Sequence, residues 1–249
     1  MLKILPLRKI FSRIRSITMP QEVKMLIHSI YLATEGEGVF IGRPQIFIRF
    51  QGCKIACRNC DSKETWAFKG PEYALNDILG TIKSLYPSIK NISITGGDPL
   101  DPFHQESVLV LCKALKSEGY FINIEAAGNV IVPEIFQLID FISFDFKTPS
   151  TGVVTPIELI RQMKGEYPGK FQVKAVVQTE EDFNATYEAY KSLGEIDFPW
   201  CLTPAYNPME QFPMDRFIMV MEKNELLGGP FRVIVQQHKW VFGPNKRNK

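Results

Sequence analysis

The chain has 249 residues, of which 45% are hydrophobic and 22% are charged, a composition typical of a folded globular protein. At about 150 residues per domain, this length predicts one domain or at most two. The formal net charge of +2 is too balanced to indicate a nucleic-acid partner. No apolar run approaches the roughly 20 residues that span a bilayer, so we expect no membrane span.

The first segment of the chain is more basic than the rest. Residues 1–24 contain six basic residues against one acidic residue, a net charge of +5, and the remainder of the chain carries about −3. This segment lacks the continuous apolar stretch of a signal peptide. We interpret residues 1–24 as a basic N-terminal extension, or as the result of an upstream start with Met25 as the true first residue. A helix lying on a membrane surface is the alternative.

Residues 25–249 show alternating strand-like and helix-like segments. Strands are predicted at 45–50, 91–95, 121–125, 141–145, 171–177, 200–203 and 231–235. Helical segments are predicted at 108–115, 133–139, 156–163, 183–193 and 213–226. This alternation is typical of βαβ units around a parallel sheet, whose right-handed crossovers curl the sheet. The units are too few for a complete eightfold barrel, so we predict an α/β fold with a partial, TIM-like barrel.

Chemically distinctive residues follow four of these strands. They are the cysteine loop after residue 50, Gly96-Gly97-Asp98, Glu125, and Asp145 with Lys147. Because active sites of α/β folds form at the carboxyl ends of the strands, we predict that these residues meet in one site.

The cysteine loop has the spacing C-x3-C-x2-C, formed by Cys53, Cys57 and Cys60. Five cysteines in total, three of them clustered, indicate metal or cluster ligands in a reducing compartment, so we expect a cytoplasmic protein. A structural zinc site needs four ligands, whereas three thiolates on a four-iron cluster leave one iron open. A zinc site and three unrelated buried thiols remain the alternatives. Cys112 and Cys201 are interpreted as buried apolar residues.

This loop, together with Gly96-Gly97-Asp98-Pro99, resembles the radical S-adenosylmethionine superfamily, whose GGEP segment holds the cofactor's amino group. Asp98 stands where glutamate is commoner. A finer resemblance, over residues 25 to about 244, is to the 7-carboxy-7-deazaguanine synthase family. It is carried by residues 34–38, 42–44, 49, 60–62, 125–128, 143–147 and 238–239, besides the cysteine loop.

The resemblance implies a radical carbon–nitrogen lyase that contracts 6-carboxy-5,6,7,8-tetrahydropterin to 7-carboxy-7-deazaguanine with loss of ammonia. The product would enter 7-deazapurine biosynthesis of the queuosine or archaeosine type. The resemblance also implies a [4Fe-4S] cluster, S-adenosylmethionine and Mg²⁺, a flavodoxin- or ferredoxin-like reductant, and a homodimer. Residues 25–249 would then form a single radical S-adenosylmethionine catalytic domain. The alternatives are a glycyl-radical-enzyme activase with the same cluster and a non-catalytic iron–sulfur or zinc module.

The resemblance also implies roles for single residues, none of them a catalytic side chain beyond the cluster and cofactor. Cys53, Cys57 and Cys60 would hold the cluster, and the Ser62 hydroxyl would bind Mg²⁺, a hard ion that prefers oxygen. The residues implied for S-adenosylmethionine are Asn59, Asp61, Gly97, Asp98, Ser143 and Lys147. Those implied for the substrate are Thr34, Glu35, Gly36, Arg49, Thr95, Glu125 and His238, with closure of the barrel as the alternative role of His238.

Arg49 has five fixed donors that suit the carboxylate of the proposed pterin. Two departures from the family pattern matter for this site. Glu35 stands where the family usually has glutamine, and the chain continues for five residues beyond Pro244, where some members end and use the terminal carboxylate.

Overall fold

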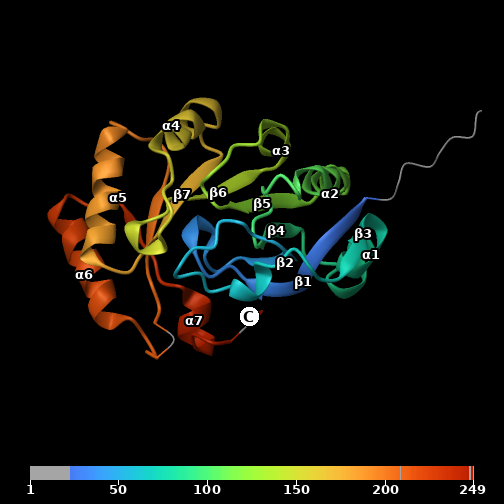
Figure 1. Cartoon of the computed structure of the whole chain (residues 1–249), viewed down its shortest axis with the longest axis horizontal. Coiled ribbons are helices and arrows are strands. Elements are labelled where there is room, and N and C mark those ends of the chain that lie inside the picture. The colour runs from blue at the N-terminus through green and yellow to red at the C-terminus, as the bar shows by residue number, and fades with distance from the viewer. Residues whose placement is uncertain (1–22, 208, 247, 249) are drawn as a thin grey trace, which may run out of the picture.

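A single nine-stranded sheet organises the fold, in the order β3-β1-β2-β4-β5-β6-β7-β8-β9 (Figure 1). The computed structural model describes residues 23–207, 209–246 and 248, so the interpretation of residues 1–24 as an extension lies almost entirely outside the described residues. The strands are β1 (Lys24–Thr34), β2 (Pro44–Phe50), β3 (Glu72–Ala74), β4 (Asn91–Gly96), β5 (Phe121–Ala126), β6 (Phe141–Asp145), β7 (Phe171–Val177), β8 (Trp200–Pro204) and β9 (Arg232–Val233). From β2 to β9 neighbouring strands are parallel, whereas β1 is antiparallel to both β2 and β3.

The helices described are α1 (Leu75–Leu85), α2 (Gln105–Ser117), α3 (Pro133–Leu138), α4 (Ile157–Glu166), α5 (Glu180–Ser192), α6 (Met214–Leu226) and α7 (Gln237–Phe242). All of them except α7 lie on the outside of the curved sheet (Figure 1). Short 3-10 turns lie at Gly38–Phe40, Lys63–Thr65 and Pro149–Thr151. Figure 1 shows α2 to α6 following one another around the sheet, with α7 apart from them. None of the helices in the described residues has the length and apolar character that crossing a membrane requires.

The two faces of the parallel strands differ in chemistry because side chains alternate along a strand. On the helix-covered face, strand register places Ile48, Ile94, Ile124 and Ile142 in one row, and all four are fully buried. On the inner face a row of polar side chains is linked by hydrogen bonds. Asn123 donates to Ser93 (3.1 Å), Ser143 donates to Asn123 (3.1 Å), and Gln172 donates to Ser143 (2.9 Å).

The predicted fold class is confirmed: the sheet is mostly parallel, alternates with helices and stays open. The last predicted strand, 231–235, is only two residues long as β9. Strands β1 and β3 and helices α1 and α7 were not among the predicted elements. The start of α1 lacks the capping signal by which helix starts are recognised in a sequence. Its N-cap residue is Ala74, which makes no side-chain capping bond.

Candidate active site

A cavity of about 710 Å³ lies inside the curve of the sheet, at the carboxyl ends of the parallel strands. The predicted site residues that line it are Thr34, Glu35, Gly36, Arg49, Cys53, Cys57, Asn59, Cys60, Asp61, Ser62, Thr95, Gly97, Glu125, Lys147 and His238. Two predicted residues, Asp98 and Ser143, do not line it. The segments that meet here span nearly the whole described chain, so the fold, rather than any single motif, builds the site.

Backbone hydrogen bonds fix the cysteine loop on both sides. Cys53 N donates to Trp66 O (3.0 Å), Arg58 N donates to Thr151 O (2.9 Å), and Cys60 N donates to Cys57 O (3.1 Å). The three thiols are half-buried, and Ser62 N donates to the Cys60 sulfur (3.4 Å). The loop therefore presents three sulfur atoms from a backbone that is already held in place.

The donor set fits an iron–sulfur cluster better than a single ion. Soft thiolates are the ligands that iron–sulfur clusters require. Among the described residues, no three His, Cys, Asp or Glu side chains are grouped closely enough for one metal ion. Burial raises the pKa of the Cys53 and Cys57 thiols, so they would lose their protons on binding a metal rather than before.

The other two cysteines are fully buried, as predicted. Cys112 lies in α2 and Cys201 in β8. Burial raises the pKa of Cys112 to about 12 and that of Cys201 to about 11, which leaves both as unreactive thiols.

A glycine pair lets the end of β4 lie directly against the cysteine loop. A Cβ on Gly97 would come within 2.1 Å of Gly52 O, and Gly96 has a φ of +124° with the Phe50 backbone 2.3 Å from its Cβ position. The Asp98 carboxylate accepts from Leu100 N (3.0 Å), and Asp98 N donates to Gly52 O (2.9 Å). Asp98 therefore holds this turn from behind, while Gly96 and Gly97 are the residues that reach the cavity.

Ser143 and Lys147, both predicted for the cofactor, lie at different depths. Ser143 belongs to the hydrogen-bonded polar row beneath the cavity. Lys147 lines the cavity and pairs with Asp145 at 2.7 Å. Burial alone would lower the pKa of Lys147, but the Asp145 charge outweighs it and raises that pKa, so the ammonium is retained.

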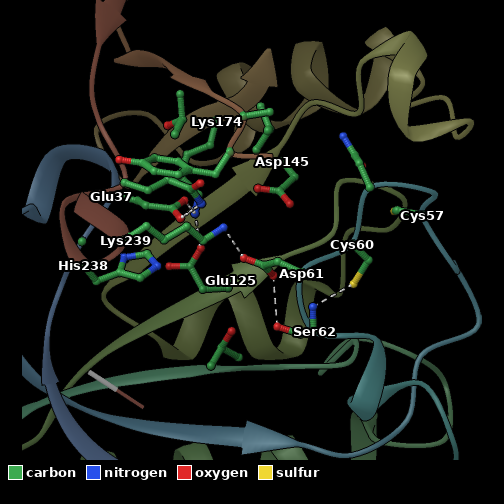
Figure 2. A pocket seen from close by; sticks show the side chains of 18 of the residues that line it. Glu37, Cys57, Cys60, Asp61, Ser62, Glu125, Asp145, Lys174, His238 and Lys239 are labelled. Carbon is green, nitrogen blue, oxygen red and sulfur yellow. Dashed lines mark hydrogen bonds and ion pairs between the residues drawn. The ribbon is translucent and has the colours of Figure 1, made fainter. Parts of the chain in front are cut away.

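A cluster of charges forms the wall opposite the cysteines (Figure 2). Lys174 Nζ lies 2.6 Å from Glu125 and 3.5 Å from Glu37, and Gln236 donates to Glu37 (2.7 Å). Burial alone would lower the pKa of Lys174, but Glu125 and Glu37 outweigh it and raise that pKa well above its ordinary value. Burial in turn would raise the pKa of Glu37, but Lys174 keeps it below its usual range. Lys174 and Glu37 are therefore both charged, and Lys174 pairs with Glu125 as well.

Between the two walls, Lys239 of α7 reaches Asp61 of the cysteine loop at 2.8 Å (Figure 2). Burial would raise the pKa of Asp61, but Lys239 outweighs it and holds that pKa well below the usual range. The Ser62 hydroxyl donates to Asp61 (3.1 Å). Because its proton is directed to Asp61, the Ser62 oxygen turns its lone pairs to other groups; Arg49 Nη1 donates to it at 3.5 Å, which leaves one lone pair available to a cation.

Glu35 makes the hydrogen bonds that hold the loop of the predicted substrate residues Thr34–Gly36. One carboxylate oxygen accepts from Gly36 N (2.9 Å) and Glu37 N (3.1 Å), and the other accepts from Gln45 Nε2 (2.5 Å). Burial, assisted by the charge of Glu125, raises the pKa of Glu35 to about 7. His238 lines the cavity and also packs on this loop, because a Cβ on Gly36 would lie 2.1 Å from its Nδ1.

Arg49 differs from the other cations of the cavity. Lys147, Lys174 and Lys239 each have a carboxylate within salt-bridge distance. The guanidinium of Arg49 instead donates to the hydroxyls of Tyr31 (2.8 Å) and Ser62 (3.5 Å), and its Nε is buried without a hydrogen-bond partner in the described part of the chain. Arg49 is therefore a half-buried cation whose charge is available to an anionic ligand.

Sequence reasoning missed part of this site. Tyr31 and Gln236 were not predicted, and neither was Lys174. A lysine within the mostly apolar run 171–177 was the available signal for the last of these, since a charge inside a buried strand is unusual unless it is paired.

Comparisons with known proteins agree with this geometry. Residues 34–128 match the family model described as a 4Fe-4S single cluster domain. The 7-carboxy-7-deazaguanine synthase of Aquifex aeolicus is 32% identical over 219 residues, which cover 86% of this chain and 91% of that protein. The enzyme of the same name from Thermoplasma acidophilum is 28% identical over 223 residues, 88% of this chain and 98% of that one. The crystal structure of QueE from Escherichia coli superposes with a TM-score of 0.64 at 22% identity, over 86% of this chain and 95% of that chain.

Proposed function

The chain belongs to the 7-carboxy-7-deazaguanine synthase family of radical S-adenosylmethionine enzymes, and we propose that the cavity described above carries out that family's reaction. The protein converts 6-carboxytetrahydropterin to 7-carboxy-7-deazaguanine by radical ring contraction with loss of ammonia. The comparisons favour neither a glycyl-radical-enzyme activase nor a non-catalytic iron–sulfur or zinc module.

In this proposal Cys53, Cys57 and Cys60 hold the [4Fe-4S] cluster, and S-adenosylmethionine binds beside it. When bound, these two groups supply the one-electron chemistry, and the protein supplies orientation and exclusion of competing reactions. Asn59, Asp61, Gly97 and Lys147 line the cavity on this side and would contact the cofactor. Asp98 and Ser143 would support those contacts from behind the wall, through the turn and the polar row that they hold.

The availability of Arg49 is the observation that carries the substrate assignment. A ligand carboxylate needs a cation that is not already neutralised, and among the half-buried lysines and arginines of the described cavity wall, Arg49 is the one without a carboxylate partner. Its planar guanidinium can bind a carboxylate through two parallel hydrogen bonds. The remaining substrate residues, which line the same cavity, are Thr34, Glu35, Gly36, Thr95, Glu125 and His238.

Ser62 is the proposed Mg²⁺ ligand. Its oxygen lies next to Arg49, so a cation there would be close to the bound carboxylate as well. Mg²⁺ keeps several waters and often takes only one or two protein oxygens, so a single hydroxyl is sufficient. Ser62→Ala should abolish most of the Mg²⁺ stimulation of turnover while the iron content and visible spectrum stay unchanged. An unaltered Mg²⁺ response in that variant would exclude Ser62 as the ligand.

Product identification tests the function directly. The purified protein is incubated anaerobically with 6-carboxytetrahydropterin, S-adenosylmethionine, Mg²⁺ and a reductant, and mass spectrometry is used to look for 7-carboxy-7-deazaguanine. In parallel, Arg49→Ala should weaken binding of the carboxypterin by about two orders of magnitude, because a desolvated charge partner is lost. Cleavage of S-adenosylmethionine without substrate should survive in that variant. Unchanged binding together with lost cleavage would show that Arg49 serves the cofactor or the fold instead.

The proposal extends to the location, the reductant and the oligomeric state of the protein. Free cysteines fit a reducing compartment, so we place the protein in the cytoplasm, with a flavodoxin- or ferredoxin-like protein as its reductant. Exposed apolar side chains on α6 and α7, among them Met214, Ile218 and Trp240, support a homodimer, which light scattering would test. Residues 25–249 form the catalytic domain in this proposal, and residues 1–24 extend from it.

A further inference from the structure

Tyr31 on β1 is placed by strand register beside Arg49 on β2. The antiparallel pairing sets Tyr31 opposite Phe47, two residues before Arg49, so the three side chains project from the same face. The Tyr31 ring stacks on Phe47, with centroids 5.2 Å apart and planes 9° from parallel. This stacking fixes the ring, and the ring in turn fixes where the hydroxyl can lie.

The Tyr31 hydroxyl makes the one short hydrogen bond that Arg49 has among the described residues. Arg49 Nη2 donates to it at 2.8 Å, whereas the bond from Nη1 to Ser62 is 3.5 Å long, which is weak. An arginine side chain has several rotatable bonds and loses considerable rotamer entropy when it is held in one place. Tyr31 therefore supplies most of the hydrogen bonding that keeps this guanidinium in position.

The position matters because Asp61 is close enough to attract the same guanidinium. The Ser62 hydroxyl donates to Asp61 at 3.1 Å and accepts from Arg49 at 3.5 Å, so a single oxygen lies between the carboxylate and the guanidinium, and Lys239 pairs with the same carboxylate. Lys239 and Tyr31 both limit this attraction. Lys239 neutralises the Asp61 carboxylate, and Tyr31 holds the Arg49 guanidinium away from it.

We infer that Tyr31 is a positioning residue that holds Arg49 ready for a ligand carboxylate and so makes the cavity selective for pterins that carry one. This inference rests on the proposed role of Arg49 in binding the substrate. Burial raises the pKa of Tyr31, so the phenol stays protonated and neutral at working pH and leaves the charge of Arg49 uncompensated.

The test compares two ligands on five proteins under anaerobic conditions: the parent, Tyr31→Phe, Arg49→Met, the double variant of these two, and a control variant. Dissociation constants are measured for 6-carboxytetrahydropterin and for 6-methyltetrahydropterin, which has no carboxylate. Phenylalanine keeps the stacking on Phe47 and removes only the hydroxyl. Tyr73→Phe is the matched control, since Tyr73 lies on β3, opposite Met25 at the far end of β1, and does not line the cavity.

Tyr31→Phe should weaken binding of the carboxypterin by about fivefold to tenfold, as expected for one hydrogen bond to a charged group, and leave the methylpterin unchanged. In turnover, KM should rise while kcat changes little. In the Arg49→Met background the same substitution should have no effect, because a residue that acts through Arg49 has nothing left to position. The Tyr73→Phe control should match the parent.

Equal weakening of both ligands would overturn the inference and assign Tyr31 a structural role. An unchanged carboxypterin affinity, or a full effect of Tyr31→Phe in the Arg49→Met background, would also overturn it. A parent that forms no product, or that binds both pterins equally, would refute the proposed function itself. The two failures are distinguishable, because the first appears only in the variants and the second already in the parent.

Discussion

The two walls of the cavity satisfy their polar groups in opposite ways (Figure 2). The cysteine loop is fixed by its backbone, and its three half-buried thiols are left to an outside group. On the opposite wall the side chains satisfy one another, with Lys174 between Glu125 and Glu37. The thiols of the cysteine loop therefore need a bound group to complete their bonding, whereas the charges of the opposite wall are already paired before any ligand binds.

This difference has an energetic consequence. A wall of fixed, paired charges does not need to reorganise when a polar ligand arrives, which is how enzymes stabilise charge at low cost. The thiols of the cysteine wall, in contrast, acquire their function only when the metal binds and their protons are released. Substitutions on the cysteine loop should therefore affect cofactor content, and substitutions on the charged wall should affect stability.

The largest expected effect is on the cysteine wall. Cys57→Ala should lose the iron–sulfur absorption and all reductive cleavage of S-adenosylmethionine, because two thiolates cannot replace three. Iron analysis and anaerobic visible spectroscopy measure this. Cys112→Ala is the control, since Cys112 is fully buried in α2, away from the cavity, and should keep its iron. Loss of iron in the control would mean that the ligand set has been assigned wrongly.

On the charged wall, Lys174→Met should destabilise the fold by about 3–5 kcal/mol, since it leaves carboxylates buried without their cation. Burial raises the pKa of a carboxyl group, and Lys174 is the main charge that lowers the pKa of Glu37 in the parent. In the variant Glu37 would take up a proton at a higher pH. The destabilisation should therefore be larger at pH 8 than at pH 5.5, which chemical denaturation at the two pH values would show.

The control for this prediction is Lys223→Met. Lys223 pairs with Glu180 at 2.6 Å, the same distance as Lys174 to Glu125, but Glu180 is largely exposed. An exposed pair contributes about 0–1 kcal/mol. A loss in Lys174→Met as small as that in the control would show that the charged wall does not depend on its lysine.

The same contrast explains what the sequence could and could not predict. The cysteine loop lies within eight residues, and its spacing alone indicates three ligands of one group. Strand and helix periodicity likewise predicted the parallel sheet, because each element carries its own pattern. These are local signals.

The charged wall depends on residues far apart in the chain. Glu37 and Lys174 are separated by 137 positions, and Glu37 and Gln236 by 199. Only the register of the sheet and the return of α7 bring these side chains together, and neither is encoded by any short motif. Strand β1 was missed for a related reason: its antiparallel pairing, which positions Tyr31, interrupts the βαβ pattern from which the other strands were predicted.

A smaller effect, on the pH dependence of stability, should follow from substituting Glu35, whose carboxylate accepts from the backbone of Gly36 and Glu37. Its pKa is raised to about 7 from an ordinary 4.5, so between these values the folded protein keeps a proton that the unfolded chain has released. Stability contributed by this proton is complete below about pH 4.5 and is lost as the pH rises through about 7, with a slope of at most about 1.4 kcal/mol per pH unit. Glu35→Gln should remove that slope. Denaturation of both proteins from pH 5 to pH 8 measures the difference, and parallel curves would show that burial does not govern this carboxyl group.

The smallest effect should come from shortening the chain to begin at Met25, because among the described residues, 23 onward, the lining of the cavity begins at Tyr31. The described contacts that would be lost are the pairing of Lys24 with Ala74, its exposed ion pair with Glu72 at 3.7 Å, and the packing of Val23 against the core. Exposed ion pairs contribute about 0–1 kcal/mol, so the melting temperature should change little and turnover should stay close to that of the full chain. Lys24→Ala in the full chain separates the loss of this pair from the loss of the segment before it. If the shortened protein is inactive although Lys24→Ala is not, residues 1–23 pack on the fold or on a second copy, and the boundary of the catalytic domain lies earlier than proposed. If activity is kept but binding to anionic lipid vesicles is lost, the net charge of +5 on residues 1–24 acts at a surface outside the cavity.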